Sequence, residues 1–151
     1  GIAQACVCCA PSVVGGWVFY TRLRACVRTR VAMQIHSPDK YVPGAHDVRI
    51  LEEDAAHVLR QMAIGEDNVV REHITWDEAA GLVTFTMVDH ARMKGSVVNI
   101  VEALSDSTCK LTFRMDWTGK GDFVVPDMQP AIEGAVKLTK RVIESHAAGK
   151  E

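Results

Sequence analysis

Residues 109–117 have the sequence CKLTFRMDW, and the alternation in this stretch decides the fold class. Every second residue from Leu111 to Trp117 is large and apolar, and the residues between them are polar. A period of two is typical of a β-strand with one buried side and one solvent-facing side. The sequence therefore predicts a sheet whose apolar face has to be covered by another element.

Five more strands are predicted upstream, because short apolar or alternating runs there are separated by turn residues. Pro43-Gly44 precedes the first of them, and Gly65 and Gly81 lie between later ones. The predicted strands are residues 48–52, 58–64, 69–76, 82–89 and 96–104. The connections are short, so we expect consecutive strands to pair as an antiparallel meander.

Helices are predicted on both sides of the strands. Residues 17–36 place apolar side chains at every fourth position, and Ser37-Pro38 ends this helix before a short turn at residues 39–42. Asp127 is a suitable N-cap for a long C-terminal helix, whose apolar stripe consists of Ile132, Ala135, Val136, Thr139, Val142 and Ile143. We therefore expect an α+β fold in which a curved antiparallel sheet wraps around the C-terminal helix.

The composition is that of one globular domain. The chain has 151 residues, of which 48% are hydrophobic and 24% charged, so it can bury a sizeable core. The net charge of −2 gives no electrostatic reason to expect nucleic-acid binding. Four arginines within residues 22–30 are explained more simply by a solvated helix face than by a phosphate site.

The five cysteines do not form a metal or disulfide pattern. Cys6, Cys8 and Cys9 lie together near the start, whereas Cys26 and Cys109 stand alone. Zinc sites usually combine two spaced pairs of ligands, and no second pair follows the first group. The sequence also lacks a glycine-rich phosphate loop and a nucleophile motif. We therefore expect no metal, no cofactor and a cytoplasmic location.

The first residues form an uncharged run that extends to Tyr20. Gln4, Pro11 and Gly15-Gly16 interrupt any apolar periodicity in it. We expect residues 1–16 to be an irregular leader that contributes little to stability, and residues 17–151 to form a single domain. The alternative interpretation is a weakly apolar membrane segment followed by positive residues.

Residues 37–44, SPDKYVPG, together with the strand that follows them, resemble a segment of the START/SRPBCC helix-grip superfamily, in particular its AtaL-like branch. Residues 71–76, residues 111–117 and the terminal helix fit the same pattern, so the resemblance covers roughly residues 31–146. It implies a helix-grip fold, in which the space between sheet and helix is either packed or hollow. Members of the superfamily include carriers, cyclases and hydratases, so the resemblance is more specific for fold than for function.

The resemblance also implies a first strand before the first helix, which residues 1–16 do not suggest. Either that strand is missing or replaced, or the leader is not native to the domain. A missing edge strand would leave its neighbour unpaired and could allow a homodimer to form through the exposed sheet edge.

The expected cavity wall follows from the inward positions of the strands and the terminal helix. Asn99 is the polar exception, and a buried amide needs hydrogen-bond partners. For any single wall residue, ordinary core packing is the simpler explanation. The candidate ligand-binding residues are Met62, Phe85, Met87, Val97, Asn99, Phe113, Met115, Trp117, Ile132 and Val136.

Two functions remain open for this cavity, and a filled core without a cavity is the third interpretation. The first function is binding of a small hydrophobic or aromatic molecule, without a membrane or nucleic-acid partner. The alternative is a cofactor-independent enzyme of cyclase, aldolase or hydratase type, with His73, Asn99 or Arg71 as acid–base candidates. Alternation favours a solvent-facing His73, because Val70 and Ile74 share the opposite side. Two ionisable groups inside the cavity would favour the enzyme, and an apolar lining would favour the carrier.

Overall fold

The computed structural model describes residues 2–9, 32–105 and 108–147. Residues 32–36 are helical and lead into the 3-10 helix η1, and no helix in the described ranges is both long and apolar enough to cross a membrane. The elements in chain order are β1 (Ala3–Cys9), η1 (Pro38–Lys40), β2 (Ala45–Glu53), β3 (His57–Ile64), β4 (Asn68–Asp77), β5 (Leu82–Val88), β6 (Met93–Lys94), β7 (Ser96–Ala103), β8 (Cys109–Met115), β9 (Thr118–Gly119) and α2 (Gln129–Ala147).

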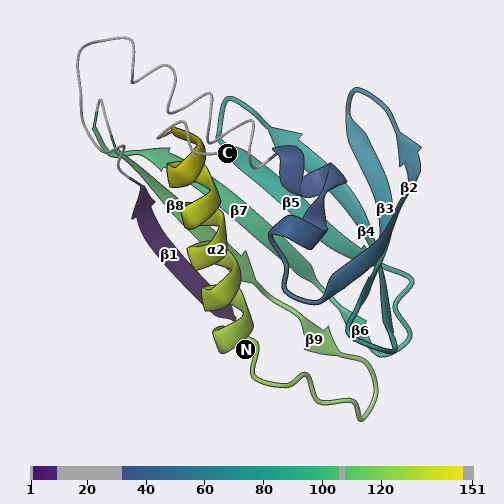
Figure 1. Ribbon diagram of the computed structural model, residues 1–151. Coiled ribbons are helices and arrows are strands. Elements are labelled where there is room, and N and C mark those ends of the chain that lie inside the picture. The colour runs from purple at the N-terminus through teal and green to yellow at the C-terminus, as the bar shows by residue number, and fades with distance from the viewer. Residues whose placement is uncertain (1, 10–31, 106–107, 148–151) are drawn as a thin grey trace.

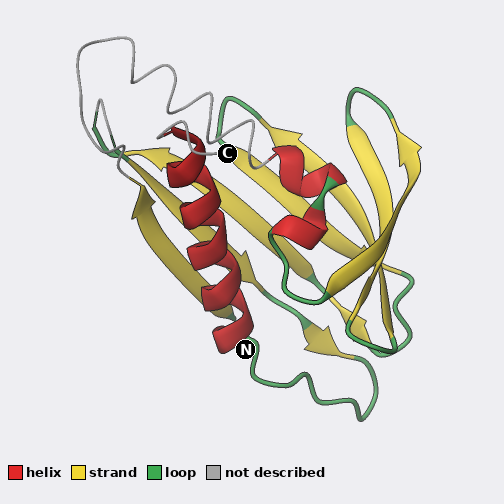
Figure 2. Ribbon diagram, in the orientation of Figure 1, coloured by secondary structure: helices red, strands yellow, loops and turns green. Residues whose placement is uncertain are grey.

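Seven strands form one antiparallel sheet in the order β1-β8-β7-β5-β4-β3-β2, and β6 pairs with β9 in a separate small sheet. Helix α2 and the shorter helical segment of residues 32–40 lie across the same face of the large sheet (Figures 1 and 2). The predicted α+β helix-grip architecture and all six predicted strands are confirmed. β6 and β9 were not expected, because two residues are too few to show a period of two.

The core lies between the sheet and α2, as the alternation predicts. On β8, Leu111 and Phe113 are buried whereas Arg114 is exposed. They belong to the same buried cluster as Val136 and Ile143 of the helix stripe. The start of α2 is fixed by Asp127, whose Oδ1 accepts a hydrogen bond from the Gln129 N–H at 3.0 Å.

The expectation of an irregular leader or a missing first strand is wrong for residues 3–9, which form β1. This strand pairs with β8 along its whole length, from Ala3 opposite Met115 to Cys9 opposite Cys109. Figure 1 shows β1 (purple) at the edge of the sheet, beside β8 and along α2. The boundary proposed at residue 16 and the helix predicted over residues 17–31 lie outside the described residues.

The outer edge of β1 is closed by a glutamine of α2. Gln129 Oε1 accepts a hydrogen bond from the Gln4 N–H at 3.1 Å, and Gln129 Nε2 donates to the Gln4 carbonyl at 2.8 Å. The amide thus takes the two backbone groups that a further strand would otherwise pair with. Because β1 already covers β8, the reason for expecting a dimer through an unpaired β8 no longer holds, and dimerisation itself stays a prediction.

Deleting residues 1–9 should therefore destabilise the protein strongly. The deletion removes a seven-residue strand and its ladder with β8, so we expect the free energy of unfolding to fall by about 3 kcal/mol or more and the melting temperature by about 5 °C or more. Thermal unfolding followed by circular dichroism measures the effect. Gln129→Ala, which removes the two bonds to Gln4 and the bond from Gln129 Nε2 to Glu133 Oε1, should lose about 1–2 kcal/mol. A truncated chain that melts with the full chain would show that β1 contributes nothing to the domain.

Candidate functional site

A cavity of about 310 Å³, called here the central cavity, lies between the inner face of the sheet and the first turns of α2. Its floor comes from β3, β4, β5, β7 and β8, and its walls come from the segment after residue 33 and from α2. Eight of the ten sequence-predicted residues line it: Met62, Phe85, Val97, Asn99, Phe113, Met115, Trp117 and Ile132. The alternation rule placed these side chains on one face, and the fold brings them together.

The other two predicted residues are buried outside this lining. Met87 packs with Val70 and Met93 in a second apolar cluster. Val136 lies one helical turn beyond Ile132, within the main core. The central cavity therefore occupies only the part of the sheet–helix interface near the start of α2.

A buried ion pair that sequence reasoning missed lies in the cavity wall. Arg60 on β3 stands directly opposite Glu72 on β4, and Arg60 Nη2 donates a hydrogen bond to Glu72 Oε2. Both side chains are more than nine-tenths buried. The sequence did indicate that both side chains point inward. Arg60 lies two residues before Met62, Glu72 lies two residues before Ile74, and every second residue of a strand points to the same face.

Arg60 also holds the segment that closes the cavity. Its Nη1 donates to the backbone carbonyls of Gln34 and Ile35 at 2.6 and 2.7 Å. The guanidinium lies over the Phe85 ring, 5.4 Å from the centroid. One side chain thus joins β3, β4 and β5 to the helical residues 34 and 35.

A series of side-chain hydrogen bonds fixes the orientation of Asn99. The Thr139 hydroxyl donates to the Ala135 carbonyl at 2.9 Å, so it accepts the hydrogen bond from Gln34 Nε2. Gln34 Oε1 then faces Asn99 and accepts from its Nδ2 at 2.7 Å. A hydroxyl has one hydrogen to donate, so this order of donors and acceptors is the consistent one. Asn99 Oδ1 is therefore left without a protein partner.

In the part of the chain that the structure describes, three buried polar atoms of the cavity wall have no hydrogen-bond partner. They are Tyr41 OH, Arg60 Nε and Asn99 Oδ1, and all three residues line the central cavity. A buried polar group without a partner costs about 1–3 kcal/mol. Water or a ligand in the cavity would supply the missing partners. Thr112 Oγ1 is a fourth such atom, but Thr112 does not line the cavity.

The acid–base candidates His73 and Arg71 lie on the outer face of the sheet. His73 is exposed and its ring lies 5.0 Å from that of His57, which confirms that it faces away from the core. Arg71 is exposed and its Nε donates to Gln61 Oε1 at 2.9 Å. Of the named candidates only Asn99 reaches the cavity. Within residues 2–9, 32–105 and 108–147, no three His, Cys, Asp or Glu side chains gather as metal ligands would.

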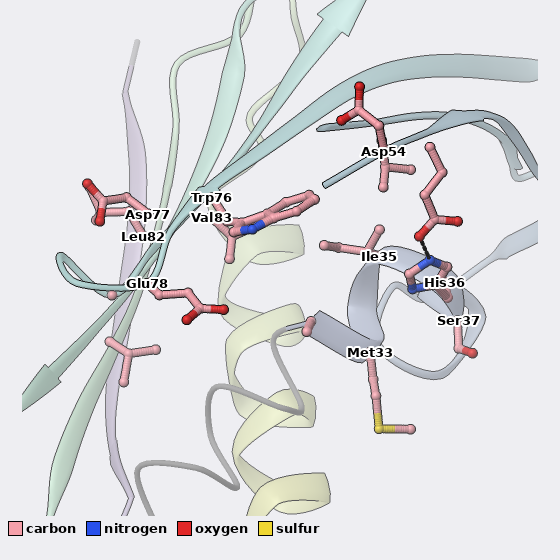
Figure 3. A pocket seen from close by; sticks show the side chains of 15 residues that line it. Met33, Ile35, His36, Ser37, Asp54, Trp76, Asp77, Glu78, Leu82 and Val83 are labelled. Carbon is pink, nitrogen blue, oxygen red and sulfur yellow. Dashed lines mark hydrogen bonds and ion pairs between the residues drawn. The ribbon is translucent and has the colours of Figure 1, made fainter. Parts of the chain in front are cut away.

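A second hollow, of about 560 Å³, lies at the opposite end of the sheet, where Trp76 and Ile35 point toward one another (Figure 3). In its polar rim, His36, Glu53 and Asp54 have partners within the protein. His36 Nε2 lies 2.8 Å from Glu53 Oε1. Asp54 Oδ1 accepts two backbone N–H bonds, which lower the pKa of its carboxyl. Its lining includes Ala32, the first described residue after residue 31.

A buried histidine stabilises the rim of the central cavity. His90 Nδ1 accepts the N–H groups of Arg92 and Met93 at 3.2 and 3.0 Å, so its proton sits on Nε2 and is donated to Asn68 Oδ1 at 3.1 Å. Asn68 lines the cavity. Burial lowers the pKa of His90, and the positive charges of Arg92 and Lys120 lower it further.

A family comparison agrees with this fold and cavity. Residues 25–147 match the model of the AtaL family, described as "Acetylaranotin biosynthesis cluster protein L". The chain belongs to the AtaL family. This AtaL-family chain has a START/SRPBCC helix-grip fold, as the segment at residues 37–44 indicated. No curated protein matches its sequence.

Solved structures share the fold at low sequence identity. The aromatase/cyclase Zhui from Streptomyces sp. R1128 has a TM-score of 0.77 at 15% identity, covering 100% of this chain and 99% of that one. A point mutant of norcoclaurine synthase from Thalictrum flavum has a TM-score of 0.71 at 12% identity, with 97% and 95% covered. A START superfamily protein from Mycobacterium smegmatis has a TM-score of 0.63 at 10% identity, with 98% and 97% covered. At these identities the likeness concerns the fold.

The structure predicts that His90 contributes to stability only while it is neutral. The pKa of His90 is lower in the folded than in the unfolded chain, where it is about 6.5. The unfolded chain therefore binds the extra proton first, and the contribution of His90 is lost as the pH falls below about 6.5. Denaturation at several pH values should show that His90→Ala loses about 1–3 kcal/mol at pH 8 and clearly less near pH 5.

The unsubstituted protein has to be compared with the His90→Ala variant, because His46 makes the stability depend on pH in the opposite direction. The Gly65 carbonyl and then the Asp47 carboxylate raise the pKa of His46, so its contribution is present at low pH and lost as the pH rises. Subtracting the His90→Ala curve from that of the unsubstituted protein removes this contribution. A loss that is the same at both pH values would contradict the neutral tautomer assigned to His90.

Proposed function

We propose that this protein binds a small hydrophobic or aromatic molecule in the central cavity. The observation that carries the proposal is the combination of a largely apolar lining with three buried polar atoms that have no partner in the protein. Ligand pockets typically combine an apolar wall with a few polar groups that orient the ligand. A filled core would leave no such space.

The wall supplies both shape and adaptability. Phe85, Phe113 and Trp117 provide large aromatic surfaces, and methionines such as Met62 and Met115 adjust to irregular ligands. A volume of about 310 Å³ lies at the lower end of the range for small-molecule sites, which favours a compact ligand. The proteins of similar fold include an aromatase/cyclase and a norcoclaurine synthase, which supports a cavity of this kind by analogy of fold.

Blocking the cavity should abolish binding without unfolding the protein. We expect an environment-sensitive apolar dye to bind with about one-to-one stoichiometry, and Met115→Trp to remove this binding while the melting temperature stays within a few degrees. The reason is that Met115 lines the cavity, where added volume has space. Fluorescence titration and thermal unfolding measure the two effects.

Met87→Trp is the matched control, because Met87 is equally buried but packs in a filled cluster. It should destabilise the protein by about 1–3 kcal/mol through overpacking. If Met115→Trp is as destabilising as Met87→Trp and the unsubstituted protein binds no dye, then the space is filled and the proposal falls.

An enzyme is the second candidate, and the inward ion pair is the observation that favours it. Glu72 could remove a proton from a carbon next to a carbonyl, while the Arg60 guanidinium stabilises the negative charge that develops on the carbonyl oxygen. Proton transfer of this kind is common to cyclase, aldolase and hydratase reactions. The outer-face residues His73 and Arg71 take no part in this hypothesis.

This second candidate predicts exchange of carbon-bound hydrogen. In D₂O, the methyl hydrogens of 2-acetylnaphthalene should be replaced by deuterium faster with the protein than in buffer, as followed by NMR. Glu72→Gln should reduce the rate about 100-fold or more, whereas Glu102→Gln, at an exposed ion pair with Lys110, should leave it unchanged. Binding without any acceleration would leave the protein as a carrier.

We propose that the protein works in the cytoplasm, without a metal or cofactor and without nucleic acid, as the cysteine pattern and net charge suggest.

A further inference from the structure

The charge of the central cavity is already balanced within its wall. Among the described residues that line it, only Arg60 and Glu72 carry a full charge, and they bind each other. The remaining polar residues of the lining, such as Gln34, Tyr41 and Asn99, are neutral. A ligand that enters this cavity therefore meets dipoles and a neutralised guanidinium, but no uncompensated charge.

An anionic ligand would disturb this balance. A carboxylate placed beside Arg60 would compete with Glu72 for one cation and leave two buried anions with one positive charge between them. A buried charge without its own partner is strongly unfavourable, because the surroundings cannot replace its hydration. The wall therefore disfavours fatty acids and aromatic acids, although its apolar surface suits their hydrocarbon parts.

The three unpartnered atoms define what the ligand must carry. Arg60 Nε can only donate a hydrogen bond, Asn99 Oδ1 can only accept one, and Tyr41 OH can do either. A complementary ligand needs an acceptor such as a carbonyl oxygen and a donor such as a hydroxyl or an N–H group. An analogue that lacks one of these groups leaves the corresponding protein atom buried and unpaired.

We propose that the central cavity selects an uncharged, largely apolar compound that carries both an acceptor and a donor, and that Glu72 excludes carboxylates by neutralising Arg60. This inference rests on the proposed binding function and adds the chemical class of the ligand. Glu72 is thus a residue that determines specificity, separate from any role in proton transfer.

A set of naphthalenes with one ring system and different polar groups tests the inference. The compounds are 2-methylnaphthalene, 2-acetylnaphthalene, 2-acetylnaphthalene with a hydroxyl at position 6 or 7, and 6-hydroxy-2-naphthoate. Their affinities for the full chain at pH 8 follow from dye displacement and calorimetry. We expect the better hydroxy-ketone isomer to bind about tenfold more tightly than 2-acetylnaphthalene, and the naphthoate to bind at least about tenfold more weakly than that isomer.

Glu72→Gln should reverse the selection against the anion. The substitution keeps the shape of the side chain but leaves the Arg60 charge uncompensated, so the naphthoate should gain about tenfold or more in affinity while the hydroxy-ketone changes little. Glu102→Gln is the matched control. It removes the same charge from a half-exposed ion pair with Lys110 outside the cavity, and the naphthoate affinity should not change.

The outcomes separate this inference from the binding function on which it rests. If the naphthoate binds the unsubstituted protein as tightly as the hydroxy-ketone, or if Glu72→Gln gives it no advantage, then the inference is wrong and the binding function stands. If none of the compounds binds, including 2-methylnaphthalene, both are wrong. Should Glu72→Gln fail to fold, the order of affinities in the unsubstituted protein decides the question.

Discussion

The buried guanidinium of Arg60 is the group around which the rest of the site is arranged. Burial of a guanidinium requires a counter-charge and several hydrogen-bond acceptors. Glu72 supplies the charge from the neighbouring strand, and the carbonyls of residues 34 and 35 supply the acceptors. The wall of the cavity, its closing segment and its charge balance therefore depend on one side chain.

The cavity exists because α2 packs against one part of the sheet and not against the whole of it. The helix contacts β1 and β8, and Gln129 ties its start to the edge strand. The inner faces of β3 and β4 are instead met by the segment around Gln34 and Tyr41. A curved sheet covered by two separate elements leaves a space where neither reaches, and polar atoms of both elements border it.

The fold of this protein does not by itself determine its function. Proteins that share 10–15% identity with the chain, among them a cyclase and a synthase, superimpose over nearly its whole length. The shared fold leaves the ligand open, and we propose that the few polar residues of the cavity wall decide what the cavity accepts. In this chain those residues are Arg60, Glu72, Asn99 and Tyr41, which is why the proposals concern the ligand's charge and hydrogen-bonding groups.

The sequence by itself determined six strands of the sheet, the terminal helix and eight of the residues that line the cavity, because alternation and helical periodicity are local patterns that burial imposes directly. The alternation along β3 and β4 could also have placed Arg60 and Glu72 on the inner face. It could not have shown that the two side chains contact each other, because that contact depends on how the strands pair. β1 needed the tertiary structure: its residues show no clear alternation, and its partner β8 lies more than a hundred residues away. Only the folded chain decided that Asn99 Oδ1 and Arg60 Nε are left without partners, because satisfaction of a buried group depends on every neighbour in space.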